Sequence, residues 1–463
     1  MNADDFGAGA CVLVIGLGRS GVASCNVLRS RGATVYATDD KDPAALSGVI
    51  DEIERSGAIF MGPKALHLAR GLTAAVLSPG VPLTNDMVRS VQAARVPVYS
   101  EIEVAYRICA APIVAVSGTK GKTTTTALIG ELFRHAGRST RVGGNIGNAL
   151  ISETAVAKPE DWVIAEVSSF QLEGIRAFKP RIAVLLNLMP DHLDRYHSME
   201  EYTEAKLRIF ANQGPGDAFI GNLDDPAIGA LAEGDGASRI PSRAYWFGLT
   251  PRRMTTLYVR RERITFAPAT GDPRPVDVMP VSEIPLLGEH NVANVLAAIL
   301  VGLIAGIEPE ELRAGVRAFK PLPHRLQTVA DVGGLLFVDD SKSTAPGSVV
   351  AALESFDRPI VLIAGGKSKG VEFRDMGAAI DRKAKAVVLI GEAGDEIAKS
   401  VSAAQIVRAP SMEEAVRLAR SLAQPGDVVL LSPGCASFDM FNSAEERGEV
   451  FTRAVGGEAV AHG

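Results

Sequence analysis

Residues 113–124 read IVAVSGTKGKTT, a β-branched run followed by a loop of glycine, threonine and lysine. The run predicts a buried strand over 113–116, and the pattern after it predicts a helix from about Lys122 to Ala136. Backbone amides at such a strand–turn–helix junction can surround phosphate groups. The strict motif would need glycine at position 116, where this chain has Val116, but the core Gly121-Lys122-Thr123 is present. We therefore expect Lys122 to reach β- and γ-phosphate oxygens, and the Thr123 hydroxyl to face Mg²⁺.

Acidic and imidazole side chains follow the next two strand-like runs. Glu166 ends the run that begins at residue 162, and His192 follows the run 182–186. In open parallel sheets, ligands gather beyond the carboxyl ends of the strands. Since Mg²⁺ also needs hard ligands from elsewhere in the chain, we expect Glu166 and His192 to lie beside the phosphate loop.

Strands and helices alternate on both sides of this unit, which predicts an α/β protein with parallel sheets. Upstream, strands are expected over 12–15, 34–38 and 74–77, and the first is followed by the GxGxxG turn 16–21. Residues 240–285 are expected to form antiparallel insertions before a helix over 291–305, and a Pro-Leu-Pro linker begins at residue 321. Further strands are expected over 335–338, 359–364, 386–390 and 428–431. We predict three consecutive α/β domains: a Rossmann-like N-terminal domain (1–105), a P-loop-type central ATPase domain (106–320) and a Rossmann-like C-terminal domain (321–463).

Composition excludes several classes of protein. The formal net charge is −6, so the chain lacks the basic field that non-specific nucleic-acid binding requires. Its four cysteines form no CxxC pair, which argues against a disulfide framework or a thiolate zinc site. The longest apolar run, 295–307, is shorter than the ~20 residues of a membrane span. We expect a cytoplasmic protein without membrane insertion.

Three stretches together resemble the Mur ligases of peptidoglycan synthesis. They are GTKGKT at 118–123, EVSSFQL at 166–172 and NLMPDHLD at 187–194. The stretches SSFQL at 168–172 and SPGCASFD at 432–439 are similar in particular to the branch of the family that uses D-glutamate. The resemblance covers essentially the whole chain, with the motifs in the family's order.

The resemblance implies an ATP-dependent ligase that adds D-glutamate to UDP-N-acetylmuramoyl-L-alanine through an acyl phosphate. It further implies two Mg²⁺ ions, one held by Thr123 and Glu166, the other by His192 and an N6-carboxylated Lys206. A carbamate there would replace a repelled ammonium by oxygen ligands. The implied catalytic residues are Lys122, Glu166, His192 and Lys206. The implied ATP-binding residues are Gly118, Thr119, Lys120, Gly121, Lys122, Thr123, Thr124, Asn291, Arg325 and Asp340.

By the same resemblance the N-terminal glycine turn holds a UDP-sugar diphosphate, and a lysine faces the side-chain carboxylate of D-glutamate. The implied substrate contacts are Arg19, Ser20, Asp39, Asp40, Lys41, Ser78, Asn145, Ser168, Lys342, Thr344, Lys369, Ser437 and Phe438. Two positions depart from the family's pattern, Tyr196 where a histidine is usual and Ala444 where an aromatic residue is usual. We expect the protein to act as a monomer.

Three other functions stay open. A sibling ligase would take another amino acid, although the siblings differ from this chain at 168–171. An ATP-binding regulatory module would have lost ligase chemistry, yet Thr123, Glu166, His192 and Lys206 are all present. A dinucleotide-dependent oxidoreductase is favoured only by the first glycine turn.

Overall fold

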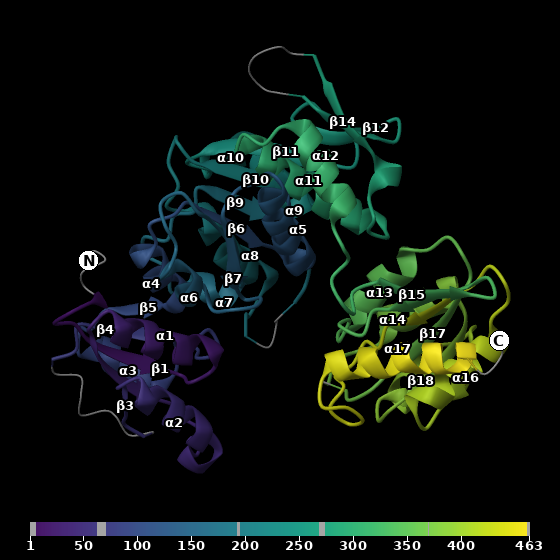
Figure 1. Cartoon of the computed structure of the whole chain (residues 1–463), viewed down its shortest axis with the longest axis horizontal. Coiled ribbons are helices and arrows are strands. Elements are labelled where there is room, and N and C mark those ends of the chain that lie inside the picture. Colours follow the sequence, from purple (N-terminus) through teal and green to yellow (C-terminus); the bar gives the residue numbers. More distant parts are fainter. Residues whose placement is uncertain (1–5, 63–70, 192–194, 268–273, 369, 461–463) are drawn as a thin grey trace. The chain divides into compact units, whose positions relative to one another are not determined.

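The computed structural model describes residues 6–62, 71–191, 195–267, 274–368 and 370–460. The chain divides into two compact units, one of residues 1–283 with 293–318 and one of 284–292 with 319–463. The first unit contains two β-sheets and the second contains one, each accompanied by helices (Figure 1). The predicted succession of three α/β domains is therefore confirmed. The exact boundaries, after residues 105 and 320, stay predictions.

The N-terminal sheet has five parallel strands in the order β3-β2-β1-β4-β5. Its central strands are buried along nearly their whole length, as expected for β-branched runs covered on both faces. The three predicted strands are present, whereas the short β3 and β5 were not predicted. The strands are β1 (Cys11–Ile15), β2 (Thr34–Thr38), β3 (Ile59–Phe60), β4 (Ala74–Leu77) and β5 (Val98–Ser100); the helices are α1 (Arg19–Ser30), α2 (Ser47–Arg55), α3 (Asp86–Ala93) and α4 (Glu101–Ile108).

The middle sheet has nine strands in the order β14-β13-β12-β11-β10-β9-β6-β8-β7. Its strands are β6 (Ile113–Ser117), β7 (Thr140–Gly144), β8 (Trp162–Glu166), β9 (Ile182–Leu185), β10 (Ala218–Asn222), β11 (Arg243–Gly248), β12 (Leu257–Arg260), β13 (Arg263–Phe266) and β14 (Val276–Pro280). Its helices are α5 (Lys122–His135), α6 (Leu150–Thr154), α7 (Ser169–Glu173), α8 (Met199–Leu207), α9 (Pro226–Gly229), α10 (Gly234–Ser238), α11 (Glu289–Ile304) and α12 (Pro309–Ala318).

The expectation that 240–285 forms only antiparallel strands is wrong. Strand β11 pairs parallel with β10, and β12 pairs parallel with β11; only β12–β13 and β13–β14 are antiparallel. The chain between β10 and β11 passes through α9 and α10, and such a crossover returns the chain in the same direction. The parallel part of the sheet therefore extends further than we predicted.

The C-terminal sheet has six strands in the order β15-β16-β20-β17-β18-β19. Only the edge strand β15 is antiparallel to its neighbour. The strands are β15 (Gln327–Val332), β16 (Leu335–Asp339), β17 (Ile360–Gly365), β18 (Ala384–Ile390), β19 (Gln405–Arg408) and β20 (Val428–Leu431); the helices are α13 (Pro346–Glu354), α14 (Arg374–Lys383), α15 (Gly394–Ser400), α16 (Met412–Leu422) and α17 (Ala444–Val460).

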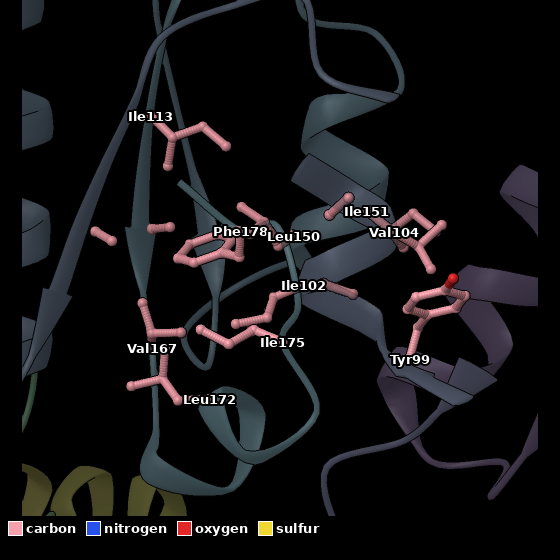
Figure 2. Packing of buried hydrophobic residues seen from close by; sticks show 14 of the residues in the cluster. Tyr99, Ile102, Val104, Ile113, Leu150, Ile151, Val167, Leu172, Ile175 and Phe178 are labelled. Atoms are coloured by element: carbon pink, nitrogen blue, oxygen red, sulfur yellow. The ribbon is translucent and has the colours of Figure 1, made fainter. Parts of the chain in front are cut away.

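One hydrophobic core joins the N-terminal and middle sheets. Figure 2 shows Ile102 and Val104 of α4 close to Leu150 and Ile151 of α6, and all belong to one cluster of buried side chains. A buried carboxylate reinforces this packing, because fully buried Glu103 accepts hydrogen bonds from the backbone amides of residues 176–178. The predicted domain boundary after residue 105 falls within α4.

The structure also bears on the expectations about membrane insertion and disulfides. Across the described residues, no helix is both long and apolar enough to span a bilayer. All four cysteines, Cys11, Cys25, Cys109 and Cys435, are free thiols.

Candidate functional site

The loop between β6 and α5 has the backbone shape of a phosphate-binding turn. Gly118 has φ +148° and Gly121 has φ +80°, conformations that side chains other than glycine rarely adopt. A Cβ atom on Gly121 would lie 2.3 Å from Oδ1 of Asn294 in α11, so that helix packs directly against the loop. The loop ends at Lys122, the first residue of α5, as predicted.

Two predicted catalytic lysines meet at one carbonyl oxygen of this loop. Lys122 Nζ donates to the carbonyl oxygens of Gly118 and Thr119, both at 2.9 Å, and Lys206 Nζ donates to that of Gly118 at 2.8 Å. Lys206 is only 2% exposed. Its burial, and secondly the charge of Lys122, lower the pKa of Lys206 to about 7, although Asp191 and Glu166 oppose the shift. A lysine with such a pKa is partly neutral at physiological pH.

Glu166 lies in the same place, at the end of β8. It is 2% exposed, and its Oε1 accepts a hydrogen bond of 2.7 Å from Asn145 Nδ2. Its Oε2 is buried and has no hydrogen-bond partner among the described residues. A buried carboxylate oxygen without a donor is suited to a cation. The structure therefore brings together Lys122, Lys206, Glu166 and Asn145. Residue spacing predicted Glu166 beside the phosphate loop, whereas Lys206 and Asn145 were implied only by the resemblance, and the roles of all four stay predictions.

The other predicted metal ligands are less fully described. Thr123 is the second residue of α5, and His192 lies outside the described residues. Where the chain is described, no group of three or more His, Cys, Asp or Glu side chains is clustered as a complete metal site. Mg²⁺ commonly takes only one or two protein carboxylates and completes its shell with phosphates and water. The donor set is thus compatible with magnesium bound together with a nucleotide.

Sequence reasoning missed two side chains that hold the loop. Asn187 follows β9, and its Oδ1 accepts from the backbone amides of Thr119 (3.1 Å) and Lys120 (2.7 Å), while its Nδ2 donates to Lys120 O (3.1 Å). The Tyr202 hydroxyl lies 3.1 Å from Thr119 Oγ1. Asn187 could have been found, since it directly follows a predicted strand at the edge where Glu166 was placed. No comparable signal marks Tyr202, in the middle of α8.

In the N-terminal domain, one predicted substrate residue reaches the middle sheet. Arg19 Nη2 donates to the carbonyl oxygens of Gly144 (3.2 Å) and Asn145 (3.1 Å). This contact brings the glycine turn 16–21 next to Asn145, and so connects two of the predicted substrate contacts. Ser20 and Ser78 are each 8% exposed.

The acidic residues after β2 accept hydrogen bonds from other groups of the protein. Asp39 Oδ2 accepts from the Leu17 amide at 2.6 Å and its Oδ1 from the Lys41 amide at 2.9 Å, while Asp40 Oδ2 accepts from Asn85 Nδ2 at 2.6 Å. Asp39 thus shapes the glycine turn. Its predicted role beside a nucleoside stays a prediction.

Helix α7 carries another predicted contact and one departure from the family pattern. Ser168 caps this helix in a reciprocal arrangement with Gln171. Tyr196 donates its hydroxyl to Glu173 Oε1 at 2.6 Å and stacks on Phe170, with the ring centroids 5.9 Å apart. Tyr196 therefore packs against α7 through one hydrogen bond and one ring contact.

The remaining predicted residues lie in the second unit. Asp340 is 4% exposed, accepts from Ser432 Oγ at 2.8 Å, and has its pKa raised to about 6 by burial. Lys342 Nζ forms an ion pair with Glu445. Ser437 is buried, whereas its neighbour Phe438 is 70% exposed. The other residues of this set are placed as follows: Asn291 in the first turn of α11 with Nδ2 on Leu287 O, Arg325 in a turn before β15, Thr344 before α13, and Lys369 outside the described residues.

Comparison with known families accounts for most of the chain. Residues 10–100 match the MurD-like N-terminal domain of Mur ligases, 116–302 the Mur ligase middle domain, and 324–435 the glutamate ligase domain of Mur ligases. The similar proteins include one from Pelotomaculum thermopropionicum, 44% identical over 96% of this chain and 97% of its own length. Another, from Koribacter versatilis, is 40% identical with the same coverage. Both are named UDP-N-acetylmuramoylalanine–D-glutamate ligase.

Solved structures share the fold at low sequence identity. The MurF ligase of Thermotoga maritima in complex with ADP superposes with a TM-score of 0.61 at 16% identity, over 93% of this chain and 96% of that one. The UDP-N-acetylmuramate–alanine ligase of the same organism gives 0.59 at 18% identity, over 96% and 99%. At this identity the comparison concerns the fold alone.

Proposed function

The chain belongs to the Mur ligase family, and from that premise we propose that it joins the amine of D-glutamate to the alanyl carboxyl of UDP-N-acetylmuramoyl-L-alanine with ATP as co-substrate. The relatives that carry this name are 40–44% identical over 96% of the chain. The observation that carries the proposal is the meeting of two lysines and a buried carboxylate at the phosphate loop. Such a site can hold a polyphosphate while an acid is activated.

In the proposed reaction the alanyl carboxylate first attacks the γ-phosphorus of ATP. An acyl phosphate forms and ADP leaves. Lys122 is placed to stabilise the negative charge that develops on the phosphate oxygens, because its Nζ already lies over the loop's carbonyl oxygens. The amine of D-glutamate then attacks the acyl carbon, and the tetrahedral intermediate expels phosphate to give the amide.

Glu166 and Thr123 are the proposed holders of one Mg²⁺. The buried Oε2 of Glu166, which no described residue contacts by a hydrogen bond, supports this assignment. Asn145, bonded to Oε1, keeps the carboxylate oriented. When bound, Mg²⁺ neutralises charge on phosphate oxygens. His192 and a carboxylated Lys206 are the proposed ligands of a second ion.

The buried environment of Lys206 suits carboxylation. Its pKa of about 7 leaves a fraction of the amine neutral, and only the neutral amine can attack CO₂. The ammonium first loses a proton to give the neutral amine. The nitrogen then forms a bond to the carbon of CO₂ and releases a second proton, so that overall a cation becomes an anion. Lys206→Ala should therefore abolish most of the activity, and short-chain carboxylates should partly restore it. Absence of any rescue would count against the carbamate.

The amino acid is proposed to bind to the second unit. Lys342, Thr344, Lys369 and Ser437 are the proposed contacts of D-glutamate. A lysine ammonium is the natural partner of its carboxylates. Arg19, Ser20, Asp39, Asp40, Lys41 and Ser78 are proposed to hold the UDP-sugar, and Asn145 its muramoyl-alanine arm. The remaining proposals are that Asn291, Arg325 and Asp340 contact ATP, and Ser168 and Phe438 the substrates.

One assay tests the proposal against its alternatives. Purified protein with Mg²⁺ and ATP should release phosphate only when both UDP-N-acetylmuramoyl-L-alanine and D-glutamate are supplied. Turnover with another amino acid but not with D-glutamate would indicate a sibling ligase. Nucleotide binding without any turnover would indicate a regulatory module, and turnover of NADH an oxidoreductase. We further propose a cytoplasmic monomer, which size-exclusion chromatography with light scattering tests for the oligomeric state.

A further inference from the structure

Helix α17 carries a charged side chain that no proposed step uses. Arg447 is 0% exposed and is the largest fully buried side chain among the described residues. Its Nε donates to Ser341 Oγ at 3.0 Å, and its Nη2 donates to Ser341 O at 2.9 Å. Its Nη1 donates to the carbonyl oxygens of Cys435 (3.2 Å) and Ala436 (3.3 Å). The guanidinium thus joins two segments that are far apart in the sequence.

The hydrogen-bond acceptors of this guanidinium are all neutral hydroxyl or carbonyl oxygens. Within the described part of the chain it forms no ion pair with a carboxylate. Burial lowers its pKa to about 10, although the nearby charges of Asp439 and Asp339 oppose the shift, and the side chain stays charged at neutral pH. Burying such a charge is costly, and apolar residues of similar volume often replace buried ionic groups without loss of stability. A role beyond stability would explain an arginine at this position.

The two segments carry proposed contacts of the amino-acid substrate. Ser341 is followed by Lys342 and Thr344, and Ala436 is followed by Ser437. A third segment joins them, since Lys367 and Ala436 exchange backbone hydrogen bonds of 2.8 and 3.1 Å. A Cβ on Gly366 would lie 3.1 Å from Arg447 Nη1, so this segment also touches the guanidinium.

We propose that Arg447 is a positioning residue for D-glutamate, because its fork of donors fixes the segments around 341–344 and 435–437 relative to each other. The inference rests on the proposed function, which assigns those segments to the amino acid. Arg447 is proposed to touch no substrate itself. It sets the distance between the proposed D-glutamate contacts in these two segments.

The contacts of Gly448, which follows Arg447, show how a positioning role can be told apart from a general structural role of α17. A Cβ on Gly448 would lie 2.1 Å from His324 Nδ1 and 2.6 Å from Asp339 Oδ2, so the backbone of α17 also packs against the turn that carries Arg325. Arg325 is a proposed ATP contact. A displaced helix would therefore raise KM for ATP and for D-glutamate together, whereas loss of the guanidinium's bridge alone raises KM for D-glutamate.

The test is steady-state kinetics on the full-length enzyme with Arg447→Lys and Arg447→Met. Lysine keeps the charge but has its three donors on one nitrogen and cannot span both segments. We expect KM for D-glutamate to rise about tenfold or more in both variants, because several hydrogen bonds to a charged group are lost. KM for ATP and for the UDP-sugar should change less than about twofold. Asp340, the proposed ATP contact next to Ser341, is held by Ser432 Oγ, the Leu326 amide and Leu431 O and not by Arg447. Arg453→Lys, an exposed arginine on the same helix, is the matched control and should leave all three values unchanged.

Ser341→Ala tests the same contact if thermal unfolding shows that neither Arg447 variant folds. Ser341→Ala removes only the Oγ that accepts from Nε and donates to Ala444 O at 2.7 Å. It should raise KM for D-glutamate by a smaller factor with the same selectivity. Equal rises in the three KM values, or an unchanged KM for D-glutamate, would overturn the proposal. Failure of the wild-type enzyme to use D-glutamate would instead overturn the proposed function.

Discussion

The amide of Asn187 offers a sharp test of how the phosphate loop is held. It makes three hydrogen bonds to the backbone of Thr119 and Lys120, at 2.7 to 3.1 Å, and contacts the loop from the neighbouring strand end. Asn187→Ala removes all three bonds and leaves Gly118, Lys122 and Glu166 unchanged. The loop keeps the bond from the Thr119 amide to Asn187 O and the contact of Thr119 Oγ1 with Tyr202. The nucleotide would have to supply the remaining order, which weakens binding.

The expected loss of ATP-binding free energy follows from the number of these hydrogen bonds and from their exposure to water. A neutral hydrogen bond contributes about 0.5–1.5 kcal/mol net, so three give about 1.5–4.5 kcal/mol. The loop amides are only partly buried and water can replace some of the lost partners, so we take the lower part of this range, about 2 kcal/mol. That corresponds to about a thirtyfold loss of affinity for ATP.

Isothermal titration of Mg-ATP into the full-length protein is the measurement. Asn222→Ala is the matched control, because Asn222, the last residue of β10, bonds through its side chain to Leu186 O and to the Asp224 amide and not to the phosphate loop. It should bind ATP within about threefold of the wild type, a change below about 1 kcal/mol. Unchanged affinity in Asn187→Ala, or an equal loss in Asn222→Ala, would refute the reasoning.

Three further perturbations test other parts of the structure. Gly121→Ala should abolish detectable ATP binding because its φ is +80° and its Cβ would clash with the side-chain amide of Asn294. Gly137→Ala, with φ +68° and no atom within 4 Å of the added Cβ, should cost about 1 kcal/mol of stability without affecting ATP binding. Glu103→Ala should lower the free energy of unfolding by about 3–5 kcal/mol in urea titrations, because Arg107 loses its ion pair with Glu103 and three backbone amides lose their acceptor; an effect below 1 kcal/mol would contradict this. Burial raises the pKa of Glu101 from 4.5 to about 7, so its contribution to stability is full below pH 4.5 and is lost as pH rises through about 7. Glu101→Gln should therefore unfold at a higher temperature relative to wild type at pH 8 than at pH 4, and a pH-independent difference would contradict the assignment.

The sheets could be predicted well from the sequence because parallel strands buried on both faces require continuous β-branched runs. Strand β6 and helix α5 were predicted to within a residue at each end. The orientation of β11 could not be predicted, since its run of residues reads the same in a parallel or an antiparallel strand. That orientation depends on the crossover through α9 and α10.

The site was predictable where its residues end strands. Glu166 follows directly from this rule, because the carboxyl ends of parallel strands share one edge of the sheet. Lys206 does not, since it lies within α8 and reaches Gly118 only through tertiary packing. Only the family resemblance pointed to it. Arg447, in a helix at the far end of the chain, gave no local signal of its contacts with Ser341.

The electrostatics of the phosphate loop explain why a lysine is suited to become an anion there. Lys122 and Lys206 both donate to the Gly118 carbonyl, so two cations compete for one oxygen inside a buried site. Their repulsion, added to burial, is what lowers the pKa of Lys206. Loss of that proton relieves the repulsion, and carboxylation would turn it into attraction toward Lys122 and any bound cation. The crowding that makes the ammonium form unfavourable therefore also favours the carbamate, without any further residue being needed to activate the amine.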